Sequence, residues 1–249
     1  MTLVNSEKEF CININGLSIP CSVTVSLKAK HIKLIMDFNG LRVVKPLKAK
    51  ISEVDKVLKS KSNWIHKHYI SFQSIRVQED ERNWESGEKI LYLGDRYELR
   101  IILHKKKLTF IDFDGYQFEI SVNENLEGSE RKAQIEKAIR KWYAQKAYET
   151  IKIRLDYFCM MSGLKYNAMR VKDQKSRWGS CSKKGNLNFN WKLIMSPQWI
   201  MDYVIIHEVC HLRHLNHSRE FWDLVARYMP DYKKAKLWLK KNGSGLCLR

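Results

Sequence analysis

The segment VIIHEVCHLRHLNHSREFW, residues 204–222, decides how this 249-residue chain is interpreted, because it holds four of the eight histidines. His207 and His211 are four residues apart, so on a helix their imidazoles project from one side, about 6 Å apart along the axis. Both rings can therefore reach one metal ion. Glu208 lies one residue further round, where it can touch a metal-bound water without being a ligand. The surrounding residues are apolar, which predicts a buried helix in which two histidines and an acid need a strong partner such as a metal.

The spacing HExxH is the signature of zinc hydrolases, in which the glutamate takes a proton from the water held by the metal. A catalytic zinc usually has three protein ligands and one open position. We favour His217 as the third ligand, because Asn216 tends to end a helix and lets the chain turn back. His214 is an alternative, but three ligands on successive turns of one helix would strain the site. Glu220 is another alternative, although an acid also suits the first turn of the next helix.

The composition describes a basic globular protein. Lys and Arg number 45 against 27 acids, a formal charge of +18, and 44% of the residues are hydrophobic. This excludes a disordered chain and favours polyanionic partners such as a nucleic acid or a nucleotide, although solubility alone also explains the charge. We find no signal peptide and no membrane-spanning stretch, and we predict no membrane association and a cytoplasmic location. The six cysteines form no CxxC pair, so we expect reduced thiols.

The order of the elements predicts an α+β protein. Short runs with Asn-Gly, Gly-Asp or Asp-Gly turns predict strands over about 9–44 and 89–122, with one basic amphipathic helix at 51–71 between them. A polar segment then precedes a long helical pattern. We therefore predict a β-rich N-terminal domain, residues 1–125, followed by a second domain, residues 126–249.

A polar loop before the motif is a weaker candidate for substrate binding. Arg177 could bind an anionic group, with Trp178 beside it, and the strand near 187–191 could pair with an extended peptide. The alternative is structural, with Trp178 in the core and Arg177 paired to a buried acid. For stabilising the transition state, Tyr203, Tyr228 and Tyr232 are weak candidates, and no residue can be assigned.

The sequence resembles the YgjP-like metallopeptidase family, a relative of the SprT-like zincins. The similarity lies in KSRWGSCSKKGNLNFNWKLIMSP (175–197), DYVIIHEVCHLRHLNHSREFW (202–222) and PDYKKAKLWL (230–239), and less distinctively in KSKSNWI (59–65) and YLGDRYEL (92–99). The resemblance implies a compact zincin-like catalytic domain at 126–249. It also implies metal ligands at the three histidines of the motif region, His207, His211 and His217, with Glu208 as the base. Cys210 stands where alanine is common, and we expect a packed thiol there.

Our leading hypothesis is a zinc-dependent hydrolase, a metallopeptidase acting on peptides or proteins with Zn²⁺ as its cofactor. A metal-dependent nucleotide pyrophosphohydrolase is the first alternative, since the same water could attack a phosphoanhydride and the positive charge would gather the substrate. A nucleic-acid-binding protein with a structural zinc is the second, although structural sites are usually closed, four-ligand and rich in cysteine. The sequence does not predict the substrate, the physiological metal or the oligomeric state.

Overall fold

The computed structural model describes residues 8–37, 39–80, 82–174 and 177–247, and the chain divides into two compact units, Met1–Arg82 and Asn83–Arg249. This division differs from the boundary at 125/126 that the sequence suggested. The reason is that the strands after residue 88 pack against the long helix that follows them: Ile90, Leu99 and Phe118 share one hydrophobic core with Ile135 and Tyr143. The change in composition near residue 125 marks a switch from strands to helices within one unit.

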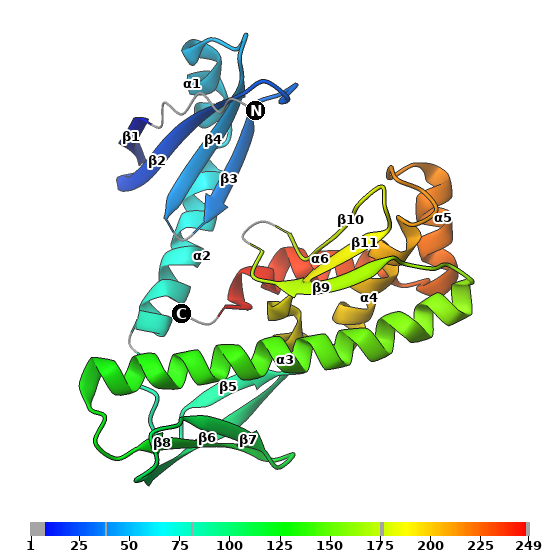
Figure 1. Ribbon diagram of the computed structural model, residues 1–249. Helices are drawn as coiled ribbons and strands as arrows, with labels where there is room; N and C mark the ends of the chain where they lie inside the picture. Colours follow the sequence, from blue (N-terminus) through cyan, green and yellow to red (C-terminus); the bar gives the residue numbers. More distant parts are fainter. Residues whose placement is uncertain (1–7, 38, 81, 175–176, 248–249) are drawn as a thin grey trace. The chain divides into compact units, whose positions relative to one another are not determined.

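The first unit consists of one sheet and two helices (Figure 1): β1 (Lys8–Ile14), β2 (Leu17–Ser26), β3 (Lys33–Asp37), β4 (Gly40–Pro46), α1 (Ile51–Ser60) and α2 (Ser62–Asp80). The strand order is β1-β2-β4-β3, with β2 and β4 parallel. Asn15 and Gly16 both have positive φ, 52° and 83°, as a two-residue hairpin turn requires. The single helix expected at 51–71 is two helices, because the chain leaves helical geometry at Lys61 (φ −112°, ψ 13°).

The second unit begins with a four-stranded sheet and a long helix: β5 (Lys89–Tyr92), β6 (Asp95–His104), β7 (Phe110–Phe113), β8 (Gln117–Asn123) and α3 (Gly128–Ser162). The strand order is β5-β6-β8-β7, and α3 contacts β7 and β8. Buried residues recur on α3 at intervals of three or four, from Ile135 to Phe158, as expected for a helix with one face in the core. Gly163 ends the helix with a left-handed conformation, φ 69°.

The rest of this unit is built around a small sheet and three helices: β9 (Ala168–Lys172), β10 (Gly179–Cys181), β11 (Asn186–Asn190), the 3₁₀ helix η1 (Trp191–Met195), α4 (Gln198–Cys210), α5 (Arg219–Tyr228), α6 (Tyr232–Asn242) and the 3₁₀ helix η2 (Gly243–Gly245). The strand order is β10-β11-β9. Since β11 pairs with a strand on each side, the segment near 187–191 cannot take a further strand. The edge of this sheet that contacts α4 is β10.

Helix α4 is the central helix of the unit and contacts α3, α5, α6 and β10. This explains why it is apolar on nearly every face, as its sequence predicted: Ile200, Met201, Ile205 and Cys210 have no exposed surface. The fold class is confirmed as α+β, with strands predominating in the first half of the chain and helices in the second. Within the described residues, no helix is both long and apolar enough to span a membrane.

Candidate metal centre

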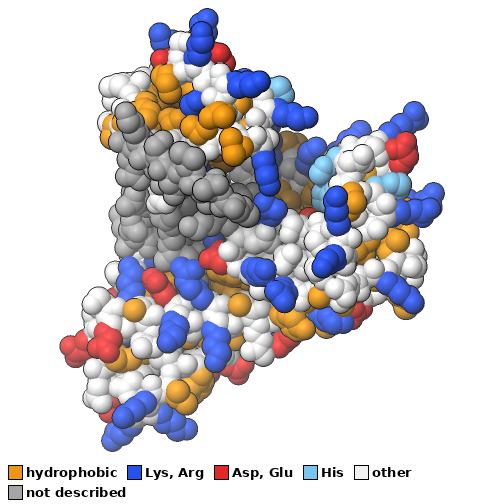
Figure 2. All heavy atoms as spheres, turned by 45° about the horizontal axis from the view of Figure 1, so that its top comes forward, with side chains coloured by type: hydrophobic (Ala, Val, Ile, Leu, Met, Phe, Trp, Pro, Cys, Tyr) orange, Lys and Arg blue, Asp and Glu red, His pale blue; other side chains and the backbone are white. Residues whose placement is uncertain are grey.

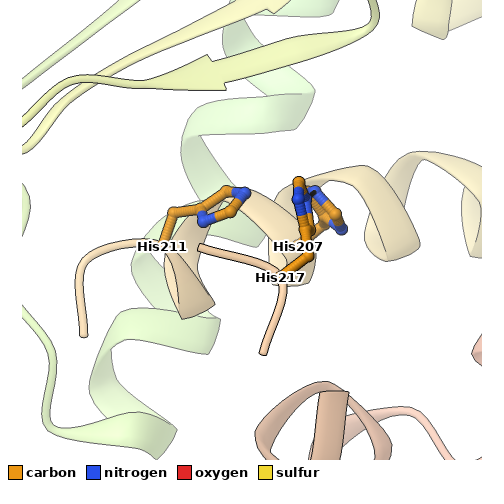
Figure 3. Close-up of side chains that lie close together, drawn as sticks. All are labelled: His207, His211 and His217. Atoms are coloured by element: carbon orange, nitrogen blue, oxygen red, sulfur yellow. Dashed lines mark hydrogen bonds between the residues drawn. The ribbon is translucent and has the colours of Figure 1, made fainter. Parts of the chain in front are cut away.

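Three histidines lie together at the end of α4 and in the loop that follows it. One nitrogen from each of His207, His211 and His217 lies within 4.8 Å of the others, and His207 Nε2 is 3.0 Å from His217 Nε2. Figure 3 shows the three rings close together: His207 on α4, His211 at the C-terminal end of that helix, and His217 on the returning loop. Within the part of the chain that the structure describes, this is the group of His, Cys, Asp or Glu side chains suited to a metal ion, and neither His214 nor Glu220 belongs to it.

The local fold explains how His217 reaches the other two rings. Helix α4 ends at Cys210, before His214, and His211 caps it with φ −68° and ψ −17°. A short turn follows, in which the amide of His214 donates to the carbonyl of Cys210 at 3.0 Å. The chain then reverses before α5 begins, and this reversal brings His217 back beside His207.

The backbone of His214 orients one of the rings. The His211 Nδ1 atom lies 2.9 Å from the carbonyl oxygen of His214. A carbonyl only accepts a hydrogen bond, so Nδ1 carries the proton and Nε2 keeps its lone pair for a metal. Phe221 stacks on the same ring, with centroids 4.4 Å apart. His214 therefore supports the site through its carbonyl oxygen and not through its imidazole.

Burial keeps the helical histidines in the form that binds metals. Burial, with His211 and His217 nearby, lowers the pKa of His207 to about 3, and burial also lowers the pKa of His211. Both rings are therefore neutral near pH 7, as metal ligation requires. His207 Nδ1 is buried without a hydrogen-bond partner among the described residues, so packing against Tyr203 and Phe221 orients this ring instead.

Glu208 is a buried acid with an unsatisfied oxygen. Glu208 is only 5% exposed, and its Oε2 atom has no hydrogen-bond partner within the described ranges. Burial raises the pKa of Glu208 to about 8, while the positive charge of Arg177 acts in the opposite direction. Burying a carboxyl group without a hydrogen-bond partner costs free energy. A cation near Glu208, with a water bound to it, would offset this cost. The three imidazoles and this acid therefore fit a divalent metal with nitrogen ligands, such as zinc.

Gly179 is a functional position that the sequence reasoning missed. A Cβ atom at this residue of β10 would lie 2.6 Å from Oε1 of Glu208 and 2.7 Å from its Cγ. Only glycine lets the acid lie directly against the strand. The sequence signal was the glycine within the RWGSC segment, but nothing in the sequence says which side chain it faces.

We expect Gly179→Ala to lower kcat/KM about 10- to 100-fold with zinc content unchanged, because the new methyl group must displace the carboxyl group of Glu208. The measurement is peptidase activity together with metal analysis. The control is Gly245→Ala, where a Cβ would have no neighbour within 4 Å, and which should behave as the wild type. Full activity in the Gly179 variant would show that the position of Glu208 against β10 is unimportant.

A cavity of about 300 Å³ opens beside His207 and Glu208. The other residues that line it are Trp178, Gly179, Tyr203, Val204, Lys236 and Leu239. Trp178 therefore faces the site, and it also packs against the core and lies 3.0 Å from the position of a Cβ on Gly243. Arg177 is exposed and acts on Glu208 through its charge.

The chain was compared with a family profile, with curated proteins and with solved structures. Residues 30–242 match the sequence profile of the YgjP-like family, described as a metallopeptidase domain. The chain belongs to the YgjP-like family. The curated proteins contain no sequence that matches this YgjP-like chain. Among solved structures, the zymogen of abylysin, a metallopeptidase of Pyrococcus abyssi, is similar with 22% identity and a TM-score of 0.34, over 36% of this chain and 93% of that one.

Proposed function

We propose that this YgjP-like protein is a zinc-dependent peptidase in which His207, His211 and His217 hold the metal and Glu208 is the general base. The observation that carries the proposal is the convergence of three imidazole nitrogens within 4.8 Å, next to a buried acid whose oxygen is unpaired. Membership of a metallopeptidase family supports the same chemistry.

A zinc ion held there would supply Lewis-acid polarisation of the scissile carbonyl and a lower pKa for the attacking water. Glu208 accepts the proton of that water on its carboxylate and passes it to the leaving amine. Gly179 allows the carboxylate to stay close to β10. Stacking of Phe221 on His211 and of Trp222 on His217 limits the motion of two ligand rings.

The free edge of β10 is the surface on which we place an extended peptide. Because β11 occupies one side of β10, the other side offers backbone groups for β-augmentation. Trp178, Val204 and Leu239 give the adjacent cavity apolar walls for a side chain. Arg177 and Trp178, which the sequence suggested as substrate-binding residues, stand at the start of this strand and keep that role in the proposal.

The test compares substrates on the wild-type protein. The purified protein is analysed for metal, stripped with a chelator, reloaded with zinc, and incubated with unfolded proteins and, separately, with nucleoside triphosphates. We expect cleavage of the unfolded proteins that is lost on stripping and restored by zinc. Hydrolysis of the triphosphates alone would favour the pyrophosphohydrolase, and tightly held zinc with neither activity would favour a structural site.

A further inference from the structure

Lys236 is a cation in the catalytic cavity that the proposed chemistry does not use. It comes from α6 and lines the cavity together with His207 and Glu208. Its charge is near enough to be one of the influences that lower the pKa of His207. Among the described residues that line the cavity, it is the one lysine or arginine, and Glu208 is the one acid.

Within the described part of the chain, Lys236 has no carboxylate as an ion-pair partner. None of the ion pairs between described side chains includes it, whereas Lys234, two residues earlier, pairs with Asp231 at 3.0 Å. The Lys236 ammonium group instead lies 4.8 Å from the centre of the Trp222 ring. That ring stacks on the metal-site residue His217, with centroids 5.6 Å apart. A cation–π contact positions the ammonium group while leaving its N–H donors available to a ligand.

The charges around the cavity favour an anion. Imidazoles bind a metal as neutral ligands, so among the described residues that line the cavity one carboxylate, Glu208, faces a bound divalent cation, and Lys236 adds a further positive charge. The protein as a whole carries +18, and Lys and Arg side chains outnumber acids on the face in Figure 2. A peptide that presents a carboxylate near the scissile bond therefore meets an unpaired ammonium group in the cavity.

We propose that Lys236 binds a carboxylate of the substrate, so that this site prefers peptides with a carboxylate next to the cleaved bond. The carboxylate is either the free C-terminus of a short peptide or the side chain of an acidic residue. This inference rests on the proposed peptidase function and adds a substrate class to it.

The experiment uses four peptides that share the sequence up to the bond that the zinc-loaded protein cleaves. Two of them end one residue beyond that bond, one with a free C-terminal carboxylate and the other with a C-terminal amide. The other two are amidated peptides that carry Glu or Gln at the position after the bond. We expect the wild type to cleave at least one carboxylate peptide about tenfold better than its neutral partner in kcat/KM, mainly through KM, as a charge-assisted contact predicts. Whichever pair shows the preference identifies the source of the carboxylate. Lys236→Met should lose the preference and Lys236→Arg should keep it.

The matched control is Lys233→Met, an exposed lysine of the same helix that does not line the cavity, and this variant should keep the preference. Zinc content and thermal melting establish that each variant is folded. An absent preference in the wild type would overturn the inference. So would an equal loss on carboxylate and neutral peptides in Lys236→Met, which would instead assign Lys236 to stabilising the transition state.

A binding measurement separates this inference from the peptidase proposal. The affinity of each peptide is measured on zinc-loaded Glu208→Gln, without and with Lys236→Met. Tighter binding of a carboxylate peptide that Lys236→Met abolishes would support the inference even if the wild type cleaved nothing, a result that would refute only the peptidase proposal. Equal binding of the carboxylate and neutral peptides, or binding of neither, would overturn the inference.

Discussion

We expect Glu208→Gln to lower peptide hydrolysis by about 1,000-fold or more while zinc remains bound. The amide has nearly the shape of the carboxyl group, so the close packing against Gly179 is preserved. It cannot accept a proton from the attacking water, and general base catalysis contributes roughly 10²- to 10⁴-fold to such reactions. Among the described residues, no other acid lines the cavity to replace it. The measurements are kcat/KM on an unfolded-protein substrate and the zinc content of the same preparation.

The control for this variant is Glu220→Gln, which changes an exposed acid on α5 outside the histidine cluster. It should keep both zinc and activity within a few-fold of the wild type. Hydrolysis at wild-type rates by zinc-loaded Glu208→Gln would refute the role of Glu208 as the base. Loss of zinc from that variant would instead place the carboxyl group among the ligands.

The part of the site that follows from local spacing could be predicted from the sequence. Residues four apart on a helix lie on one side of it, so His207 and His211 follow from the period of the helix alone. The placement of His217 needed only one further step, the expectation that the chain turns at Asn216. The structure brings these three rings together, and their binding of a metal stays a prediction. The sequence did not indicate two features of this loop. The helix ends before His214, and the carbonyl oxygen of His214 accepts a hydrogen bond from the ring of His211.

The contributions of distant segments could not be predicted in this way. Gly179 and Lys236 reach the cavity from β10 and α6, and no periodicity links those elements to α4. The dependence on contacts between distant segments also explains why the domain boundary expected at 125/126 differs from the division at 82/83 in the structure. Composition records where strands give way to helices near residue 125, but which strands pack on α3 depends on contacts between side chains far apart in the chain. Pairing on both sides of β11 is likewise a property of the whole sheet.

We expect His217→Ala to lower the affinity for zinc by more than about 100-fold and to abolish peptide hydrolysis at limiting zinc. His217 is the proposed ligand from the loop, and its Nε2 atom lies 3.0 Å from Nε2 of His207, so its removal would leave two of the three proposed protein ligands. Altering a residue that only supports a ligand costs roughly 10- to 100-fold in metal affinity, and removal of a ligand itself should cost more. The measurement is competition for zinc against a chelator of known affinity, followed by activity at a fixed concentration of free zinc.

His214→Ala is the matched control, because it removes an imidazole of the same loop and keeps the backbone carbonyl that accepts the hydrogen bond from His211. We expect its zinc affinity and activity to remain within a few-fold of the wild type. The two variants thus separate the two histidines that compete for the third position on sequence grounds alone. If His214→Ala released the metal and His217→Ala retained it, the ligand set would include the ring of His214, and the approach of His217 to His207 would have no part in binding zinc.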